Sequence, residues 1–299
     1  MGRSRGDRRE QIMTTGSCLC GAVRYEVKGP YAWMAHCHCS MCRKHHGALY
    51  GTMLGAAKAN FRWLSGETAI VHYRASSAFE RPFCEHCGST VPDTSGEHVI
   101  VPAGTLTEPI EMKPSAHIFV GSKSPMCDIT DSLQQFEQYP PGFGMAVSAP
   151  VAPYADGSLS GSCLCGEITY AIDQAPSKLV HCHCTRCQRS RGTAHASNTF
   201  VRQEHLRWLR GAESLKTYKV AQAQAFTTTF CARCGSLLPS LFEPIRRYNV
   251  PLGSLDQPLA AKPSLHIHVA SRAAWFDITD ALERFDEMPP RERIKELMF

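Results

Sequence analysis

The sequence predicts an all-β protein built from two tandem zinc-binding domains, each ending in a short helical turn. Three observations predict this class. Cysteine-rich motifs occur twice at a nearly constant offset, which indicates a duplicated unit. Short segments alternate between apolar and polar residues, as half-buried strands do. Glycine, proline and serine interrupt these segments often, as expected between short strands.

The duplication rests on three motifs. They are GSCLCG from Gly16 and again from Gly161, HCHCxxC from His36 and again from His181, and FCxxCGS from Phe83 and again from Phe230. Fourteen of the fifteen cysteines pair in this alignment. The remaining one, Cys127, has Phe276 as its counterpart. We therefore expect Cys127 to be a buried apolar residue and not a metal ligand.

The repeat also sets the expected domain boundaries. We expect a disordered basic tail at 1–15, zinc-binding domains at 16–138 and 161–289, a linker at 139–160 and a C-terminal tail with a small helix at 290–299. The linker is rich in proline, glycine, alanine and serine, which is typical of a connection over the surface. The two domains are expected to pack on each other.

Composition argues against a membrane or nucleic-acid partner. No stretch approaches the roughly 18 apolar residues that a membrane helix needs, and residues 1–11 lack the apolar core of a secretory signal. The net charge of +5 is spread along the chain, without a basic stripe that alternates with aromatic residues. We therefore expect a cytoplasmic protein.

Strands are expected where apolar and polar residues alternate. The expected strands are 22–27, 69–74, 98–102, 117–120 and 167–172. Apart from the C-terminal tail, helix is expected only near the end of each copy, at 131–136 and 280–285. There an aspartate able to cap a helix precedes apolar residues at helical spacing.

Metal binding explains fifteen cysteines better than disulfides do. Without a secretion signal, we expect the thiols to stay reduced, and the spacings CxC, CxCxxC and CxxC can each place sulfurs on one ion. Seven sulfurs per copy cannot form two closed four-cysteine sites, so we divide them into four and three. With one Zn²⁺ in each cluster, the chain would bind two ions per domain and four in all.

The closed site is expected to combine the first and last clusters of each copy. Its ligands are Cys18, Cys20, Cys84 and Cys87 in the first copy, and Cys163, Cys165, Cys231 and Cys234 in the second. Such a site ties two distant strands together and supplies folding energy to a small domain.

The middle cluster supplies three sulfurs. They are Cys37, Cys39 and Cys42 in the first copy, and Cys182, Cys184 and Cys187 in the second. Three protein ligands and a vacant position are typical of a catalytic zinc. Three thiolates make the ion a weak Lewis acid toward water but a good acceptor for a substrate thiol. In the alternative, a histidine closes the site; the candidates are His36, His38, His181 and His183.

The order of these motifs resembles the glutathione-dependent formaldehyde-activating enzyme family, which also includes centromere protein V. The order is GSCxCG, HCHCxxC, FCxxCGS, GxLxxP and HI, over 16–139 and again over 161–288. The resemblance implies a β-tent fold with a structural zinc and an active-site zinc, in agreement with the division into four and three. It implies a carbon–sulfur lyase that condenses formaldehyde with glutathione to S-hydroxymethylglutathione and reverses this reaction.

An enzyme of this kind needs groups besides the metal. An acid–base residue must move the alkoxide proton, and His38 and His183 are the candidates. Glutathione carries two carboxylates, which basic residues beside the triplets could bind, although ordinary solvated charges are the alternative reading. These residues are Arg43, Lys44, Arg186, Arg189 and Arg191. The segments that follow the triplets differ between the copies, so we expect the two sites to differ in substrate preference or activity.

Other functions are also consistent with the motifs. The chain could be a non-enzymatic zinc module that binds a macromolecule, which a closed fourth ligand in both triplet sites would favour. It could also be an enzyme of the same fold acting on another thiol adduct or electrophile, because substrate choice lies in loops that the motifs do not place. A zinc-finger DNA reader fits less well, because the spacings do not frame a recognition helix.

Overall fold

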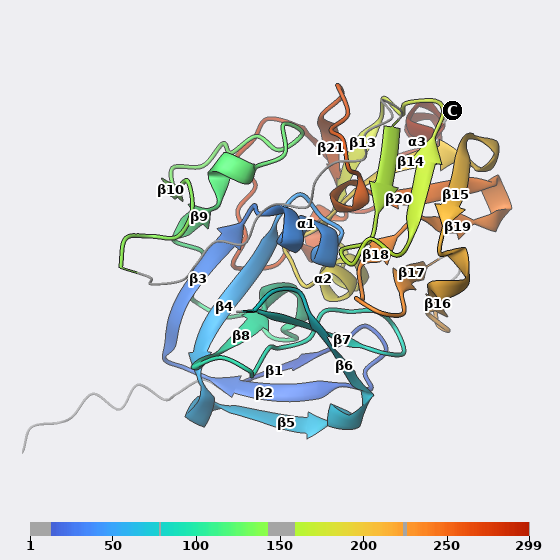
Figure 1. Ribbon diagram of the computed structural model, residues 1–299. Helices are drawn as coiled ribbons and strands as arrows, with labels where there is room; N and C mark the ends of the chain where they lie inside the picture. Colours follow the sequence, from blue (N-terminus) through green and yellow to red (C-terminus); the bar gives the residue numbers. More distant parts are fainter. Residues whose placement is uncertain (1–12, 78, 143–158, 224–225, 299) are drawn as a thin grey trace, which may run out of the picture.

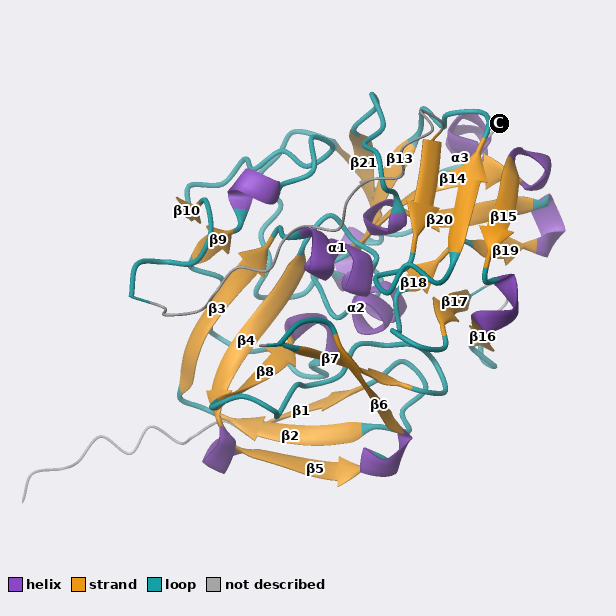
Figure 2. Ribbon diagram, in the orientation of Figure 1, coloured by secondary structure: helices purple, strands orange, loops and turns teal. Residues whose placement is uncertain are grey.

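Strands dominate the structure, a computed structural model that describes residues 13–77, 79–142, 159–223 and 226–298. Two sets of strands lie beside each other, and two short helices, α1 and α2, lie between them (Figure 1, Figure 2). The prediction of an all-β protein is confirmed, since helices are few and short over the described residues.

The two copies contain corresponding elements in the same order. The first copy contains β1 (Met13–Ser17), β2 (Arg24–Lys28), β3 (Tyr31–Cys37), α1 (Ser40–His46), β4 (Gly51–Ala57), β5 (Phe61–Ser65), β6 (Ile70–Arg74), β7 (Glu80–Cys84), β8 (His98–Pro102), β9 (Ala116–Ile118) and β10 (Gln134–Phe136). The second contains β11 (Leu159–Ser162), β12 (Thr169–Ile172), β13 (Leu179–Cys182), α2 (Thr185–Arg191), β14 (Ala196–Arg202), β15 (Leu206–Arg210), β16 (Leu215–Lys219), β17 (Thr227–Cys231), β18 (Leu237–Leu238), β19 (Ser240–Phe242), β20 (Arg247–Pro251), β21 (Pro263–Ile267), β22 (Glu283–Arg284) and α3 (Arg291–Met298).

Each copy forms two main sheets. One has the order β1-β2-β5, matched by β11-β12-β15. The other has the order β10-β9-β3-β4-β8, matched by β22-β21-β13-β14-β20 with β19 added at the edge. In the second sheet β3 and β13 lie between an antiparallel and a parallel neighbour. Each of these strands ends at the first cysteine of a CxCxxC motif, Cys37 or Cys182, and is therefore held by a neighbouring strand on both sides.

The ends of the copies differ from the expected boundaries. β1 begins at Met13, inside the expected tail, and Thr15 pairs with Glu26 of β2. Of the expected linker, residues 143–158 lie outside the described part of the chain, and Leu159 already belongs to β11. The small C-terminal helix forms as α3.

The helical turns expected at 131–136 and 280–285 are wrong. Short strands form there instead, and β10 and β22 pair in parallel with β9 and β21. Asp131 does accept a hydrogen bond from a following backbone N–H, that of Leu133. However, its carboxylate also accepts one from Nε2 of His117, which holds the segment in a turn against the sheet. The same aspartate signal thus caps a turn and not a helix.

The helices α1 and α2 were not predicted, because the CxCxxC cysteines resembled loop residues. In each helix the middle cysteine is the N-cap: Sγ of Cys39 accepts from the backbone N–H of Cys42, and Sγ of Cys184 from that of Cys187. A left-handed glycine at Gly47, with φ 59°, ends α1. Each triplet is therefore arranged around the start of a short helix.

The glycine that begins each GSC motif has a packing reason. A Cβ at Gly16 would lie 2.1 Å from the ring of Tyr25, which is fully buried. The hydroxyl of Tyr25 lies 2.6 Å from that of Thr105, so the buried phenol has a hydrogen-bond partner. Only glycine allows the first strand to cross this ring.

The two copies contact each other through α1 and α2. Each helix packs on a short turn of the other copy, and a glycine in that turn allows the close approach. A Cβ at Gly253 would lie 2.2 Å from the carbonyl oxygen of Arg43, and one at Gly104 would lie 2.3 Å from that of Thr193. Exchange of equivalent partners in this way is the sign of an approximate two-fold relation.

A buried cation reinforces this contact. The Nζ of Lys44, on α1, donates to the backbone oxygens of Ser162 and Ser254 and forms an ion pair with Asp256 of the second copy. Burial lowers the pKa of Lys44, and the Asp256 carboxylate opposes this shift. At the surface, Lys113 and Asp277 form an exposed ion pair across the same boundary.

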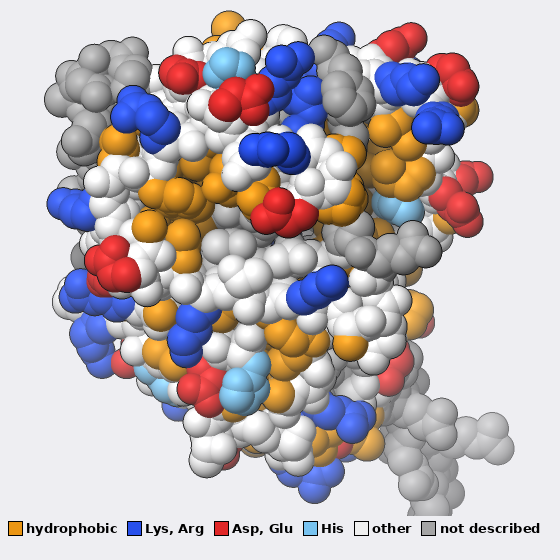
Figure 3. Space-filling view, turned by 90° about the vertical axis from the view of Figure 1, so that its right-hand side faces the viewer, with side chains coloured by type: hydrophobic (Ala, Val, Ile, Leu, Met, Phe, Trp, Pro, Cys, Tyr) orange, Lys and Arg blue, Asp and Glu red, His pale blue; other side chains and the backbone are white. Residues whose placement is uncertain are grey.

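Over the described residues, no helix is both long enough and apolar enough to cross a membrane. On the face shown in Figure 3, Lys and Arg side chains alternate with Asp and Glu, and neither sign gathers into one patch.

The ion pair of Lys44 predicts a stability difference. Asp256→Asn would leave the Lys44 ammonium buried without its counter-charge, which costs about 3–5 kcal/mol. Lys113→Ala is the matched control; it removes an exposed pair and should cost no more than about 1 kcal/mol. Chemical denaturation measures both. A loss below about 1 kcal/mol for Asp256→Asn would contradict a role of this pair in joining the copies.

Candidate metal centres

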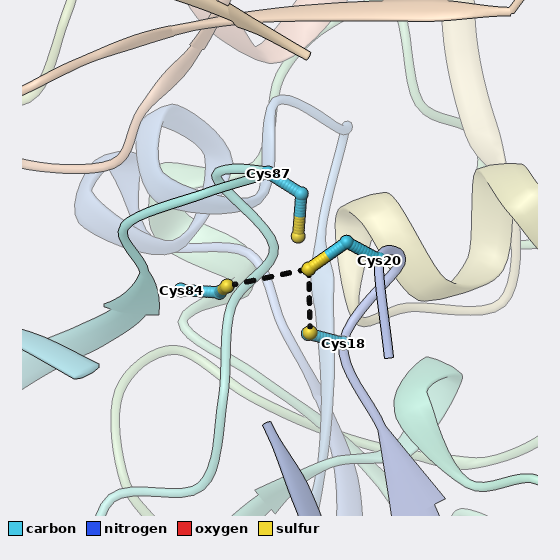
Figure 4. Close-up of side chains that lie close together, drawn as sticks. All are labelled: Cys18, Cys20, Cys84 and Cys87. Carbon is cyan, nitrogen blue, oxygen red and sulfur yellow. Dashed lines mark hydrogen bonds between the residues drawn. The ribbon is translucent and has the colours of Figure 1, made fainter. Parts of the chain in front are cut away.

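The four-cysteine cluster of the first copy joins two hairpins. Cys18 and Cys20 lie in the turn between β1 and β2, Cys84 ends β7 and Cys87 lies in the turn after it. Figure 4 shows the four sulfur atoms pointing toward a common centre. The Sγ atoms of Cys18 and Cys20 are 3.4 Å apart, and those of Cys20 and Cys84 are 3.7 Å apart. All four sulfurs lie within 4.8 Å of one another.

This geometry fits a tetrahedral metal ion. Four thiolates at about 2.3 Å from zinc stand roughly 3.8 Å from one another. The second copy repeats the arrangement, with 3.4 Å between Sγ of Cys163 and Cys165 and 3.8 Å between Sγ of Cys165 and Cys231. Both clusters can therefore hold a metal ion.

Backbone and hydroxyl groups surround these sulfurs. The N–H of Val23 donates to Sγ of Cys18 at 3.3 Å, and the hydroxyl of Ser89 lies 3.3 Å from Sγ of Cys87. The same hydroxyl accepts from the N–H of Leu19, which links the two hairpins. Such contacts orient the ligands and stabilise thiolates. The contacts of Ser89 also explain why the last motif extends beyond its cysteines to CGS.

The three-cysteine cluster lies at the end of β3 and the start of α1. The Sγ atoms of Cys37, Cys39 and Cys42 lie within 4.8 Å of one another, as do those of the equivalent triplet in the second copy. A hydrogen bond between the first two sulfurs raises the pKa of Cys37 and lowers that of Cys39. Without a cation, the crowded sulfurs thus compete for protons. A bound divalent ion would stabilise all three as thiolates.

The structure does not support a Cys₃His site. Over the described residues, no histidine nitrogen joins either triplet within the 4.8 Å that groups the sulfurs. Nε2 of His38 lies 2.8 Å from Nδ1 of His117, whose Nε2 lies 3.0 Å from the carboxylate of Asp131. The carboxylate of Asp131 only accepts, so Nε2 of His117 donates to it. Nδ1 of His117 then accepts from Nε2 of His38, which leaves the lone pair of the His38 ring on its Nδ1. His183, His266 and Asp280 repeat this chain of contacts.

The two histidines proposed as acid–base groups are buried on the far side of the triplet. Burial lowers the pKa of His38 to about 3, so that its imidazole is neutral near pH 7, and it lowers the pKa of His183 as well. Neither histidine borders the cavity at the triplet of its own copy. Their Nδ1 atoms are buried and have no partner in the described part of the chain. This placement favours a positioning role.

Most of the basic residues expected at the substrate are used elsewhere. Lys44 is bound in the contact between the copies, as described above. Arg191 is buried there too and donates to the backbone oxygen of Gly47 and to Oδ1 of Asn198. Arg43 donates to the backbone oxygens of His38 and Ser122 and ties α1 to the neighbouring turn. We therefore do not retain Lys44 and Arg43 as substrate ligands, whereas Arg191 also borders the cavity beside Cys187.

Arg186 and Arg189 are placed differently. The guanidinium of Arg186 lies over the ring of Phe226, 5.5 Å from its centroid, and Arg189 is half-buried on α2. Neither borders the cavity at the second triplet.

One cation at the first triplet was not predicted. Arg81, on β7, is buried, and its Nη2 lies 3.8 Å from Sγ of Cys42. Burial acts to lower the pKa of Arg81, but negative charge on the three sulfurs outweighs it and the pKa rises. The equivalent residue of the second copy is Thr228, so the repeat carried no signal for this arginine.

A cavity of about 180 Å³ adjoins the first triplet and is bordered by all three of its cysteines. Its remaining walls are mainly apolar, and the side chains come from strands and turns far apart in the sequence. They include Trp33, Met53, Phe79, Ile100, Phe119 and Tyr139. The cavity that borders Cys187 in the second copy measures about 50 Å³.

The fold and the cysteine clusters define a mostly β, metal-binding protein with a duplicated unit. Comparison with known families identifies the unit. The model of the family described as "Glutathione-dependent formaldehyde-activating enzyme" matches residues 13–122 and again residues 158–271. The chain therefore belongs to this family, which confirms the resemblance seen in its motifs.

Individual relatives match over shorter stretches. A Halomonas elongata protein named "Putative glutathione-dependent formaldehyde-activating enzyme" is 36% identical over 95 residues, which are 27% of this chain and 55% of that protein. The chain thus spans about half the length of this curated relative. A crystal structure of a Rhodobacter sphaeroides protein is 27% identical, with a TM-score of 0.28, over 32% of this chain and 91% of the other.

The geometry predicts how metal content responds to mutation. Cys39→Ser and Cys84→Ser should each remove about one metal ion per chain, because each breaks one cluster. Cys84→Ser should also lower the melting temperature more, since its cluster joins two hairpins. Cys127→Ala is the matched control and should retain every ion, because Cys127 is buried outside the clusters. Elemental analysis of the purified variants gives the counts; unchanged metal in Cys39→Ser would contradict the assignment.

Proposed function

We propose that this chain is a zinc-dependent carbon–sulfur lyase that acts on adducts of glutathione, or another thiol, with formaldehyde or a related electrophile. The observation that carries the proposal is the first triplet, where three sulfurs and no histidine adjoin a cavity large enough for a substrate. Membership of the family and the name of the Halomonas relative support the choice of reaction.

The proposal assigns zinc to all four clusters, two ions in each copy. A zinc ion held by three thiolates supplies a position for a substrate thiol and lowers the pKa of that thiol. Cys37, Cys39 and Cys42, which all border the cavity, would hold this ion. The four-cysteine clusters keep the hairpins of each copy together and take no part in the reaction.

Arg81 is proposed to stabilise the charge that develops in the reaction. Addition of a thiolate to an aldehyde moves negative charge from sulfur to the carbonyl oxygen. The guanidinium is already fixed beside Sγ of Cys42, so it needs no rearrangement to face this charge. The apolar walls exclude water, which strengthens the interaction.

His38 is proposed to position the triplet rather than to transfer a proton. Its backbone N–H donates to the carbonyl oxygen of Ile118, and its own carbonyl oxygen accepts from Arg43. Together with the ring contact to His117, these bonds hold the residue between Cys37 and Cys39. His183 has the same contacts in the second copy, to Ile267 and Gln188.

The proposal places the protein in the cytoplasm, with a small-molecule thiol as its partner and with no nucleic-acid partner. It treats 16–138 and 161–289 as two domains of one β-tent type, joined by 139–160. The competing function is a zinc module that binds a macromolecule without catalysis. It would be supported if a fourth protein ligand closed both triplet sites.

The activity can be tested directly. The zinc-loaded protein should accelerate the interconversion of glutathione, formaldehyde and S-hydroxymethylglutathione, followed by exchange NMR. Cys37→Ser should reduce the rate at least tenfold. The loss of rate in Cys182→Ser measures how much the second copy contributes to the activity. Cys127→Ala is the control that keeps all ligands. A rate no greater than the spontaneous one, with zinc present in every cluster, would exclude the formaldehyde reaction.

A further inference from the structure

The geometry of the first triplet points to a larger and more apolar substrate than formaldehyde. We infer that the cavity in the first copy takes an aromatic or bulky aliphatic group, carried by the aldehyde part of the thiol adduct, and that the second copy does not. This inference rests on the function proposed above and names its substrate class.

The cavity in the first copy is large and its walls are mainly apolar. A cavity of about 180 Å³ is several times the share of liquid volume that one water occupies, about 30 Å³. Formaldehyde has two heavy atoms and would leave most of this space unfilled. The walls formed by Trp33, Met53 and Ile100 offer dispersion contacts to an apolar group and few hydrogen bonds.

The cavity in the first copy offers little positive charge to a substrate carboxylate. Among its lining residues only Arg81 carries a full positive charge, and that charge already faces the triplet sulfurs. The two carboxylates of glutathione would lose their water here without gaining partners, which is costly. The peptide part of the thiol is therefore expected to point out of the cavity, and the aldehyde part to point into it.

The second copy has different side chains at the positions that form these walls. Four of the six wall positions named above are polar there: Lys178 stands for Trp33, Asn198 for Met53, Asn249 for Ile100 and His268 for Phe119. The strand register supports these equivalences, because Met53 and Asn198 both face a proline of the neighbouring strand. The backbone is thus shared, and at Asn198 and Asn249 the change lies in side chains that border the cavity of the second copy.

The second copy would also reject an apolar group. Oδ1 of Asn249 is buried and has no hydrogen-bond partner among the described residues. An apolar group beside it would leave it unpaired, at a cost in binding. The first copy has Ile100 at this position and carries no such penalty.

A residue with a strained backbone at the cavity of the first copy supports the inference that this wall contacts a ligand. Phe119 has φ 60°, a conformation that bulky side chains rarely adopt. Its ring packs edge-to-face on Tyr139, with 4.7 Å between centroids, and both border the cavity. His268 has nearly the same backbone, with φ 57°. This backbone conformation therefore belongs to both copies. In the first copy the side chain at this position is an aromatic ring that borders the cavity.

The proposed reaction is balanced without a further reactant. A thiol RSH adds to an aldehyde R′CHO to give RS–CH(OH)R′, where R′ is the apolar group in the cavity. The C–S bond forms while the C=O double bond becomes a C–O single bond. The thiol proton ends on the new hydroxyl oxygen, and the reverse step returns it.

Binding of simple thiols separates this inference from activity. The zinc-loaded protein carrying Cys184→Ser, which disables the second triplet, is titrated with benzyl mercaptan and with 2-mercaptoethanol by calorimetry. These thiols have similar acidity but differ in apolar surface. We expect benzyl mercaptan to bind at least tenfold more tightly and to change the fluorescence of Trp33, with Trp33→Phe identifying that signal. Equal affinities would overturn the inference.

The wall residues supply the matched variants. Met53→Asn with Ile100→Asn, in the Cys184→Ser background, gives the first copy the side chains of the second and should abolish the preference while metal content stays unchanged. Asn249→Ile, in the same background, changes only the equivalent wall of the second copy and should leave the preference intact. A preference that survives Met53→Asn with Ile100→Asn would contradict an apolar pocket at these walls.

An activity measurement keeps the two proposals apart. Glutathione is combined with benzaldehyde or with formaldehyde, and adduct exchange is followed by NMR. We expect a larger acceleration for benzaldehyde. Acceleration of formaldehyde exchange without any thiol preference would overturn the apolar pocket and leave the lyase. Preferential binding of benzyl mercaptan with neither reaction accelerated would overturn the lyase and leave the apolar pocket.

Discussion

Each copy depends on four sulfur atoms that lie closer together than neutral thiols favour. Cys18 and Cys20 come from one hairpin and Cys84 and Cys87 from another, and their sulfurs lie within 4.8 Å. A cation at their centre would turn this crowding into a bond between the β1–β2 hairpin and the β6–β7 hairpin. These small sheets can then be short, because a metal would replace part of an apolar core.

The contact between the copies is the second constraint, and it determines which basic side chains remain available to bind a substrate. The helices α1 and α2 start at the triplets and pack on turns of the opposite copy. Lys44 follows the first triplet in sequence, but α1 turns it into this contact, where it pairs with Asp256. Fusion of two copies in one chain thus uses for packing a residue that sequence proximity suggested for binding.

The copies share a backbone and differ in what lines it. Both place three sulfurs around a helix start, and both hold a histidine against an imidazole and a carboxylate behind the triplet. At the cavity beside the triplet, the first copy presents Arg81 and mainly apolar side chains, whereas the second presents Arg191, hydroxyl groups and the amides of Asn198 and Asn249 beside fewer apolar residues. Duplication therefore allows one fold to carry two different sites.

The sequence by itself determined the duplication, the all-β class and the grouping of cysteines into four and three, because metal-ligand spacing and strand alternation are local patterns. The sequence wrongly predicted a helix after Asp131, because an aspartate that caps a helix and one that caps a turn have the same local sequence pattern. It did not predict α1, because the N-cap of this helix is a cysteine. Only the tertiary structure decided that Lys44 is buried and that Arg81 lies beside Cys42. Those contacts join residues far apart in the chain, and local spacing carries no information about them.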